Sequence, residues 1–110
     1  MKTGDFVKLK NGYIDEIDWL GELKEDIYGV HLSKEPKKRF HNVDEIIKSK
    51  PNIINLIEVD DYVNGSKVLS VTIYGVYIED GTTYGNTYIE EKDIKSIVTK
   101  EQFKNIEYKI

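Results

Sequence analysis

The chain has 110 residues, no cysteine and a formal net charge of −4. These features exclude structural disulfides and thiolate metal sites, and they argue against a protein whose main role is to grip nucleic-acid phosphates. No apolar run approaches the roughly 20 residues needed to cross a bilayer, and the first residues lack the apolar core of a signal peptide, so we expect a cytoplasmic protein.

Strand-type residues separated by turn signals predict a series of short β-strands in the first half. Asn11-Gly12 is a hairpin-turn dipeptide, and the charged run from Lys34 to Arg39 is typical of an exposed hairpin tip. Alternation in the second strand favours Ile17 and Trp19 as inward-facing residues. The predicted strands span 5–9, 13–20, 27–32 and 39–41, and a helical turn capped by Asn42 follows them.

The second half repeats this order after an apolar stretch at the middle of the chain. Pro51 is predicted to open a tight turn that leads into a strand over 56–59. Thr99 and Gln102 have the spacing of a capping box, which predicts one helical turn before a final strand. The predicted strands are 59–63, 67–73, a segment containing Tyr74 and Tyr77, 87–89 and 106–108.

Short sequence echoes link the two halves in the same order. Asp5-Phe6-Val7 matches Asp61-Tyr62-Val63, and Tyr28-Gly29-Val30 matches Tyr74-Gly75-Val76. The echoes lie 46 to 56 residues apart. Loops of unequal length in two copies of one unit would produce this spread.

These echoes predict an all-β fold of two tandem SH3-like small barrels with short helical turns, because each half has about five strands and a helical turn before the last one. The first unit would span 1–55 and the second 56–110. The two units would pack through the central apolar stretch, whose members are Ile53, Ile54, Leu56 and Ile57. The alternative is a single fused domain with one continuous sheet, in which common turn chemistry produces the echoes.

The search for catalytic or metal-binding patterns finds no phosphate-binding glycine loop, nucleophile elbow or zinc-protease helix. His31 and His41 could share a metal across the charged hairpin, but no carboxylate lies at a spacing typical of a metal site. We therefore expect ordinary strand histidines and no metal. The acidic clusters around Glu16 and Glu91 lie beside lysines, and we expect them to be solvated. The sequence therefore predicts a protein that is not an enzyme and holds no cofactor.

Two segments resemble a family of small proteins encoded by phages and prophages of low-GC Gram-positive bacteria. The first is N-I-I-N-L-I-E-V-D-D-Y-V-N-G over 52–65, and the second is I-K-S-I-V-T-K-E-Q-F over 94–103. The likeness covers mainly residues 44–110 and brings no catalytic motif. It implies a setting in which small accessory proteins bind and block a host protein, such as a CRISPR nuclease or another defence factor.

Charge and tyrosine are both concentrated in ways that favour the second half for recognition. Residues 1–55 hold ten basic and ten acidic side chains, whereas 56–110 hold six and ten. Six of the eight tyrosines also lie in the second half. Tyrosines on an acidic surface suit a protein partner with a basic surface. The predicted contact residues are Glu79, Asp80, Tyr84, Glu90 and Glu91, with Tyr84 as an anchor on the loop 79–86.

Two alternatives to this contact surface remain. The loop 79–86 could be a hairpin without a partner, with the tyrosines serving only the core. The protein could instead be a nucleic-acid-binding accessory that uses the basic tip, which consists of Lys34, Lys37, Lys38 and Arg39 beside Phe40. The acidic net charge makes nucleic acid the less favoured partner.

Overall fold

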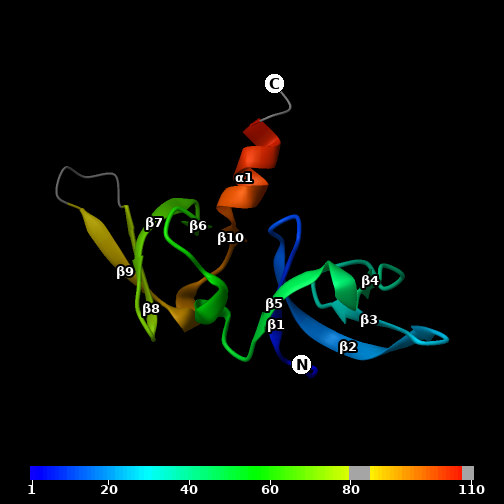
Figure 1. The fold of residues 1–110 in the computed structure, drawn as a ribbon. Helices are drawn as coiled ribbons and strands as arrows, with labels where there is room; N and C mark the ends of the chain where they lie inside the picture. The colour runs from blue at the N-terminus through cyan, green and yellow to red at the C-terminus, as the bar shows by residue number, and fades with distance from the viewer. Residues whose placement is uncertain (80–84, 108–110) are drawn as a thin grey trace.

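The computed structural model describes residues 1–79 and 85–107, with side chains through Lys104. Its strands form two five-stranded antiparallel sheets, one from each half of the chain (Figure 1). The all-β prediction is confirmed at this level. No helix in the described part of the chain is long and apolar enough to cross a membrane.

The first sheet has the strand order β4-β3-β2-β1-β5. Its fifth strand returns to pair with the first, after a 3-10 helix that a capping box between Asn42 and Glu45 begins. The elements are β1 (Phe6–Leu9), β2 (Ile14–Lys24), β3 (Ile27–Leu32), β4 (His41–Asn42), η1 (Val43–Glu45) and β5 (Ile46–Lys50).

The second sheet has the matching order β10-β6-β7-β8-β9. A 3-10 helix again precedes the strand that returns to the first one of the sheet. The elements are β6 (Tyr62–Val63), β7 (Ser66–Val71), β8 (Gly75–Glu79), β9 (Asn86–Glu90), η3 (Glu91–Asp93) and β10 (Ile97–Val98), followed by α1 (Lys100–Glu107). A third 3-10 helix, η2 (Ile53–Leu56), joins the two sheets.

The same turn opens both sheets. The carboxylates of Asp5 and Asp61 accept a hydrogen bond from the backbone N–H three residues earlier, at 3.1 Å and 2.8 Å. The residues before them, Gly4 and Asp60, have positive φ angles of 91° and 76°. The aromatic residue that follows each aspartate begins the first strand of its sheet, as the sequence echo predicts.

The same bulge also interrupts both sheets. An extra residue, Asp18 in β2 or Leu69 in β7, shifts the pairing with the following strand. Because a bulge puts two residues opposite one, the side chains beyond it change face. Ile17 is therefore fully buried, whereas Trp19 is 40% exposed. The prediction that Trp19 points inward is wrong for this reason.

Two segments near the ends of the predicted units differ from the sequence-based prediction. Residues 53–56 form η2 rather than a turn into a strand over 56–59. The predicted final strand is replaced by α1, which includes Ile106. The capping box is present, because Gln102 Oε1 accepts from the Thr99 N–H at 3.0 Å and Thr99 Oγ1 accepts from the Gln102 N–H at 3.3 Å. The Lys-Glu-Gln residues that follow favour continued helix over strand.

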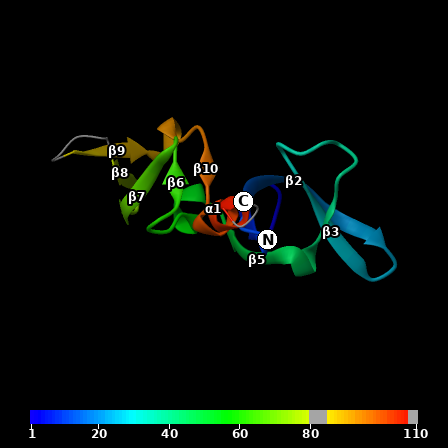
Figure 2. The same ribbon diagram turned by 90° about the horizontal axis from the view of Figure 1, so that it is seen from above.

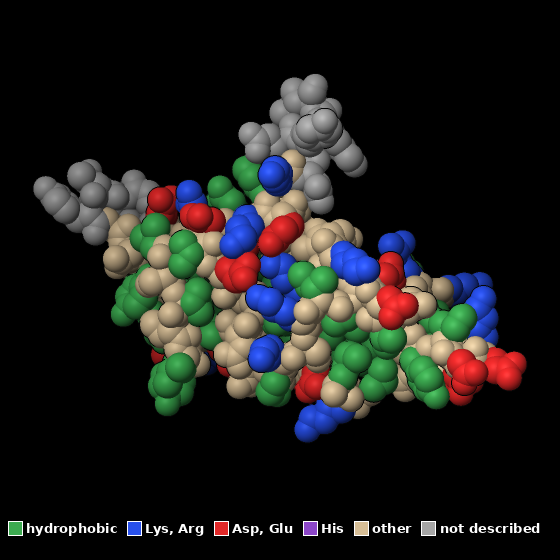
Figure 3. All heavy atoms as spheres, in the orientation of Figure 1, with side chains coloured by type: hydrophobic (Ala, Val, Ile, Leu, Met, Phe, Trp, Pro, Cys, Tyr) green, Lys and Arg blue, Asp and Glu red, His purple; other side chains and the backbone are tan. Residues whose placement is uncertain are grey.

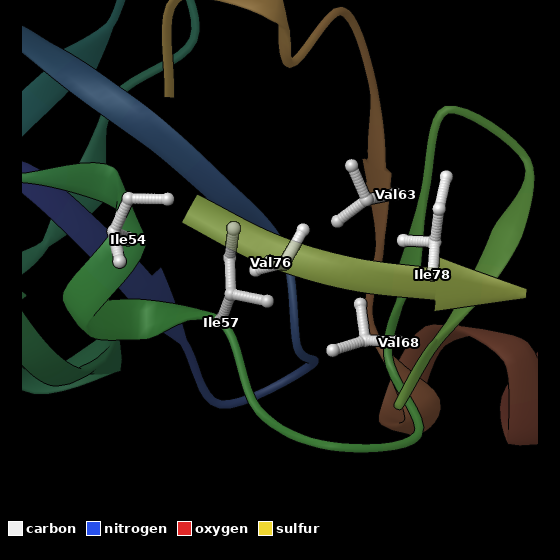
Figure 4. Close-up of a cluster of buried hydrophobic side chains, with 6 residues drawn as sticks. All are labelled: Ile54, Ile57, Val63, Val68, Val76 and Ile78. Carbon is white, nitrogen blue, oxygen red and sulfur yellow. The ribbon is translucent and has the colours of Figure 1, made fainter. Parts of the chain in front are cut away.

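Each sheet has its own apolar core. The first is made by Val7, Leu9, Ile17, Val30 and Leu32. The second contains four strand residues that meet two residues of the central apolar stretch: Val63, Val68, Val76, Ile78, Ile54 and Ile57 (Figure 4). Since η2 also lies against β1 and β5, the central stretch contacts both sheets.

The junction between the sheets is polar as well as apolar. Lys8 of β1 is only 1% exposed, and its Nζ lies 3.4 Å from Glu58 and 3.1 Å from Glu101. The Thr99 hydroxyl donates to the Gly12 carbonyl at 2.9 Å. Figure 2 shows α1 between the two sheets, and Figure 3 shows basic and acidic side chains interleaved at the same place.

Candidate functional site

The predicted contact residues do not form one cluster. Glu79 pairs with Asn86 at one end of the β8–β9 ladder, and Glu90 pairs with Gly75 at the other. Four residue steps of strand, about 13 Å, separate these ends. Glu79 and Glu90 are exposed, and Glu91 is partly buried. Asp80 and the proposed anchor Tyr84 lie outside the described residues.

Glu90 and Glu91 instead lie beside two other tyrosines. With Tyr74, Tyr88 and Lys92 they line an open hollow of about 650 Å³. Tyr74 is 71% exposed and Tyr88 is 38% exposed, so both rings offer contact area to a partner. We call these five residues the tyrosine hollow.

The turn between β7 and β8 positions Tyr74. The Thr72 hydroxyl oxygen accepts from the N–H of Tyr74 at 3.3 Å and of Gly75 at 3.1 Å. The Tyr74 carbonyl in turn accepts from the Glu91 N–H at 3.2 Å, which fixes the start of η3 beside the turn. This backbone bond explains why a tyrosine and two carboxylates that are distant in sequence share one surface.

Tyr88 is held by contacts with three residues. Its ring lies 4.9 Å from the Tyr77 ring, and its hydroxyl lies 3.3 Å from the Thr72 hydroxyl. A Cβ at Gly75 would come within 2.8 Å of the Tyr88 ring, so glycine at this position allows the ring to cover the strand. The sequence signal for the hollow is the tyrosine enrichment of the second half, but only the strand register identifies which tyrosines are involved.

The four cations of the basic tip are exposed in the loop between β3 and β4. Arg39 Nε lies 2.7 Å from Glu35, which also contacts His41 Nε2 at 2.7 Å. Lys34, Lys37 and Lys38 form no ion pair with any residue in the described part of the chain. The tip therefore places three lysine charges in solvent, while its arginine is paired within the loop.

The two histidines belong to separate hydrogen-bond networks. His31 Nδ1 lies 2.6 Å from Asp18 and Nε2 lies 2.8 Å from the Pro36 carbonyl. The Pro36 carbonyl, together with Asp18, raises the pKa of His31 above its ordinary value. His41 is held by Glu35 and Glu45. No group of three metal-binding side chains is present among residues 1–79 and 85–104.

One member of the acidic cluster at 15–18 is not solvated as predicted, whereas Asp18 is exposed. Asp15 is 4% exposed, and its carboxylate accepts from the Tyr13 hydroxyl and from the Lys34 N–H, both at 2.9 Å. Burial and the hydrogen bond with Asp15 raise the pKa of Tyr13. Asp15 thus anchors the start of the basic tip, a structural role that the sequence pattern does not reveal.

Comparisons with known proteins identify no relative of this chain. No family model matches the chain, and no curated protein or solved structure shows significant similarity to it. The surfaces of this molecule are therefore the basis for its proposed function.

Proposed function

We propose that the protein is a non-enzymatic protein-binding module and that the tyrosine hollow docks on a basic surface of its partner. The observation that carries this proposal is the exposure of Tyr74 and Tyr88 beside Glu90 and Glu91. Tyrosine is enriched among residues that dominate binding energy, and rim carboxylates speed the approach of a basic partner.

The likeness to phage-encoded proteins supplies the biological setting of the proposal. In that setting the partner is a host protein in the bacterial cytoplasm, for example a defence nuclease whose nucleic-acid channel is basic. The protein would then act as an inhibitor, as anti-CRISPR proteins do. Each half of the chain, 1–55 and 56–110, would be one SH3-like small barrel. The shared strand order, opening turn and bulge support that description.

The test begins with affinity capture from a Gram-positive host lysate, followed by binding kinetics with the purified partner. Tyr74→Ala should weaken binding about tenfold or more, because it removes a ring that would contact the partner. The ring is mostly exposed, so its removal should not disturb the core. Tyr28→Ala is the matched control, since Tyr28 is 52% exposed on the first sheet. Both variants should melt at the parent temperature.

The charge component is tested in the same assay. Glu90→Lys with Glu91→Lys should slow association, most strongly at low salt, because screening weakens electrostatic steering. Glu22→Lys at the end of β2 with Glu25→Lys in the turn that follows is the matched control. Parent-like binding by both the Tyr74 and the Glu90/Glu91 variants would contradict the proposed surface.

Nucleic-acid binding through Lys34, Lys37, Lys38 and Arg39 is the second candidate function. The specific observation in its favour is that Lys37 of this basic tip lines one hollow with the exposed rings of Trp19 and Phe40. Because the tyrosine hollow is on the second sheet, the two functions are tested by different variants.

A further inference from the structure

The first sheet carries an aromatic hollow of about 270 Å³, lined by Asp18, Trp19, His31, Lys37 and Phe40. The Trp19 and Phe40 rings are 5.4 Å apart and nearly perpendicular, at 78°. Both side chains are large and partly exposed, at 40% and 45%. This volume lies just below the range typical of drug-sized ligands, so the hollow suits one flat ring system.

We infer that this hollow binds an unpaired base of single-stranded nucleic acid, with Trp19 and Phe40 contacting the base and Lys37 contacting its phosphate. Base stacking on aromatic side chains is the usual way in which proteins hold single strands without reading sequence. A base stacked on one of these two rings would meet the edge of the other, which is a favourable aromatic geometry. The inference rests on the second candidate function, nucleic-acid binding through the basic tip, and it concerns a different surface from the tyrosine hollow.

Local charge favours a nucleic-acid strand over an acidic peptide. The loop 33–40 holds four cations and one carboxylate, a net charge of +3 in a protein whose net charge is −4. Lys37 lines the hollow itself, and Lys34 and Lys38 are exposed on the same loop. These cations can follow successive phosphates on either side of a bound base.

The carboxylates near the hollow are engaged within the protein. Asp18 lies 2.6 Å from the His31 ring, and Glu35 lies 2.7 Å from both Arg39 and His41. Both carboxylates are therefore paired, and Asp18 is the one that keeps part of its side chain, 43%, exposed. An approaching phosphate meets the lysines as the exposed charges of the loop.

Both rings pack against neighbouring groups of the first sheet. Gly21 lacks a Cβ, and one built there would come within 2.7 Å of the Trp19 ring, so the indole lies against the strand. The His31 and Phe40 ring centroids are 5.5 Å apart. The His31 ring is itself held in position, because its Nε2 donates to the Pro36 carbonyl at 2.8 Å. A preformed site loses less conformational entropy on binding.

Trp19 is the only tryptophan in the chain, so its fluorescence reports on this hollow directly. We would titrate the protein with an oligothymidine of about 15 nucleotides, which exceeds the span of a single small site. Saturable quenching that weakens with added salt is the expected result. A duplex of the same length, heparin and a poly-glutamate peptide serve as probes that lack unpaired bases.

Two substitutions assign the binding to the hollow. Phe40→Leu and Lys37→Ala should each weaken oligothymidine binding by about fivefold or more. The first removes stacking on a base, which contributes at least about that factor, and the second removes a contact with the phosphate. Phe40→Leu is chosen over Phe40→Ala because leucine keeps apolar volume at this position and is less disruptive to folding. Tyr28→Ala on β3 and Lys10→Ala in the turn after β1 are matched controls away from the hollow, and both should bind like the parent. Tyr74→Ala should also bind oligothymidine like the parent.

Three results would overturn the inference. One is the absence of saturable quenching by oligothymidine. Another is equal quenching by duplex, heparin or poly-glutamate, which would show general polyanion binding or a peptide site. The third is parent-like binding by both Phe40→Leu and Lys37→Ala. None of these results bears on the tyrosine hollow, so the two proposals are tested independently.

Discussion

Both ring nitrogens of His31 face groups that can only accept a hydrogen bond at neutral pH. One is the Asp18 carboxylate, and the other is the backbone carbonyl of Pro36. A neutral imidazole has one donor and one acceptor, so it cannot satisfy both contacts. The geometry therefore favours the doubly protonated ring, with the Pro36 carbonyl and then Asp18 as the main causes of its raised pKa.

This arrangement predicts a pH-dependent contribution of His31 to stability. Because the folded-state pKa lies above the unfolded value, the contribution is fully present below about pH 6.5 and is lost as pH rises through the raised pKa. The melting-temperature difference between the parent and His31→Phe should thus be larger at about pH 5.5 than at about pH 8.5. An NMR titration of the His31 ring measures the pKa independently. A midpoint at or below 6.5 would contradict the prediction.

At the scale of elements, the two Asn-Gly turns place their glycines in different surroundings. Gly12 and Gly65 have similar positive φ angles, 94° and 85°. A Cβ at Gly12 would overlap Thr99 Oγ1 and lie 2.8 Å from Glu101 Cβ, whereas one at Gly65 would meet nothing within 4 Å. The β1–β2 turn is therefore a docking site for the start of α1, and its counterpart in the second sheet is free of such contact.

This difference separates backbone strain from helix docking. Gly65→Ala should cost about 1–2 kcal/mol, the usual penalty for alanine in a left-handed conformation. Gly12→Ala should cost about 1–3 kcal/mol more, because the added methyl group must displace Thr99 and Glu101. Chemical denaturation measures both costs, and backbone NMR shifts of 99–104 report the helix. Equal costs for the two variants would show that α1 does not depend on this contact.

The elements also show where sequence reasoning succeeds and where it fails. The echoes at Asp5 and Asp61 identify equivalent turns because a side-chain cap and a positive φ leave a local residue signature. The orientation of Trp19 cannot be predicted in the same way, because the bulge at Asp18 is visible only in the pairing with β3. Likewise, Tyr74 meets Glu91 through a backbone bond between distant turns, which periodicity does not encode.

For the molecule as a whole, the least predictable residue is Lys8. Lysine is almost never fully buried unless it is paired, and its partners Glu58 and Glu101 lie 50 and 93 residues further along the chain. Glu58 also accepts from Lys100 and Lys48, each at 3.1 Å, and these two ammonium groups with Lys8 hold the pKa of Glu58 at about 2. One carboxylate thus connects β1, β5 and the start of α1.

This network predicts strong coupling between the halves. Glu58→Gln with Glu101→Gln should lower the free energy of unfolding by about 3–5 kcal/mol, because it removes both ion-pair partners of the buried Lys8 ammonium. Adding Lys8→Met should recover most of that loss, since methionine fills a similar volume and carries no charge. Asp60→Asn is the control, because the Asp60–Lys67 pair is exposed, and it should change stability by less than about 1 kcal/mol.

The measurement is denaturant unfolding at neutral pH, followed by Trp19 fluorescence for the first sheet and by far-UV circular dichroism for the whole chain. The Glu58 contribution is complete under these conditions, because a depressed carboxyl pKa stabilises the fold above the ordinary value of 4.5 and loses that effect only as pH falls toward 2. In the parent the two probes should report one midpoint, as expected when the halves unfold together. If the Glu58/Glu101 variant keeps the parent midpoint, or if Lys8→Met fails to rescue it, the buried ammonium does not join the two sheets.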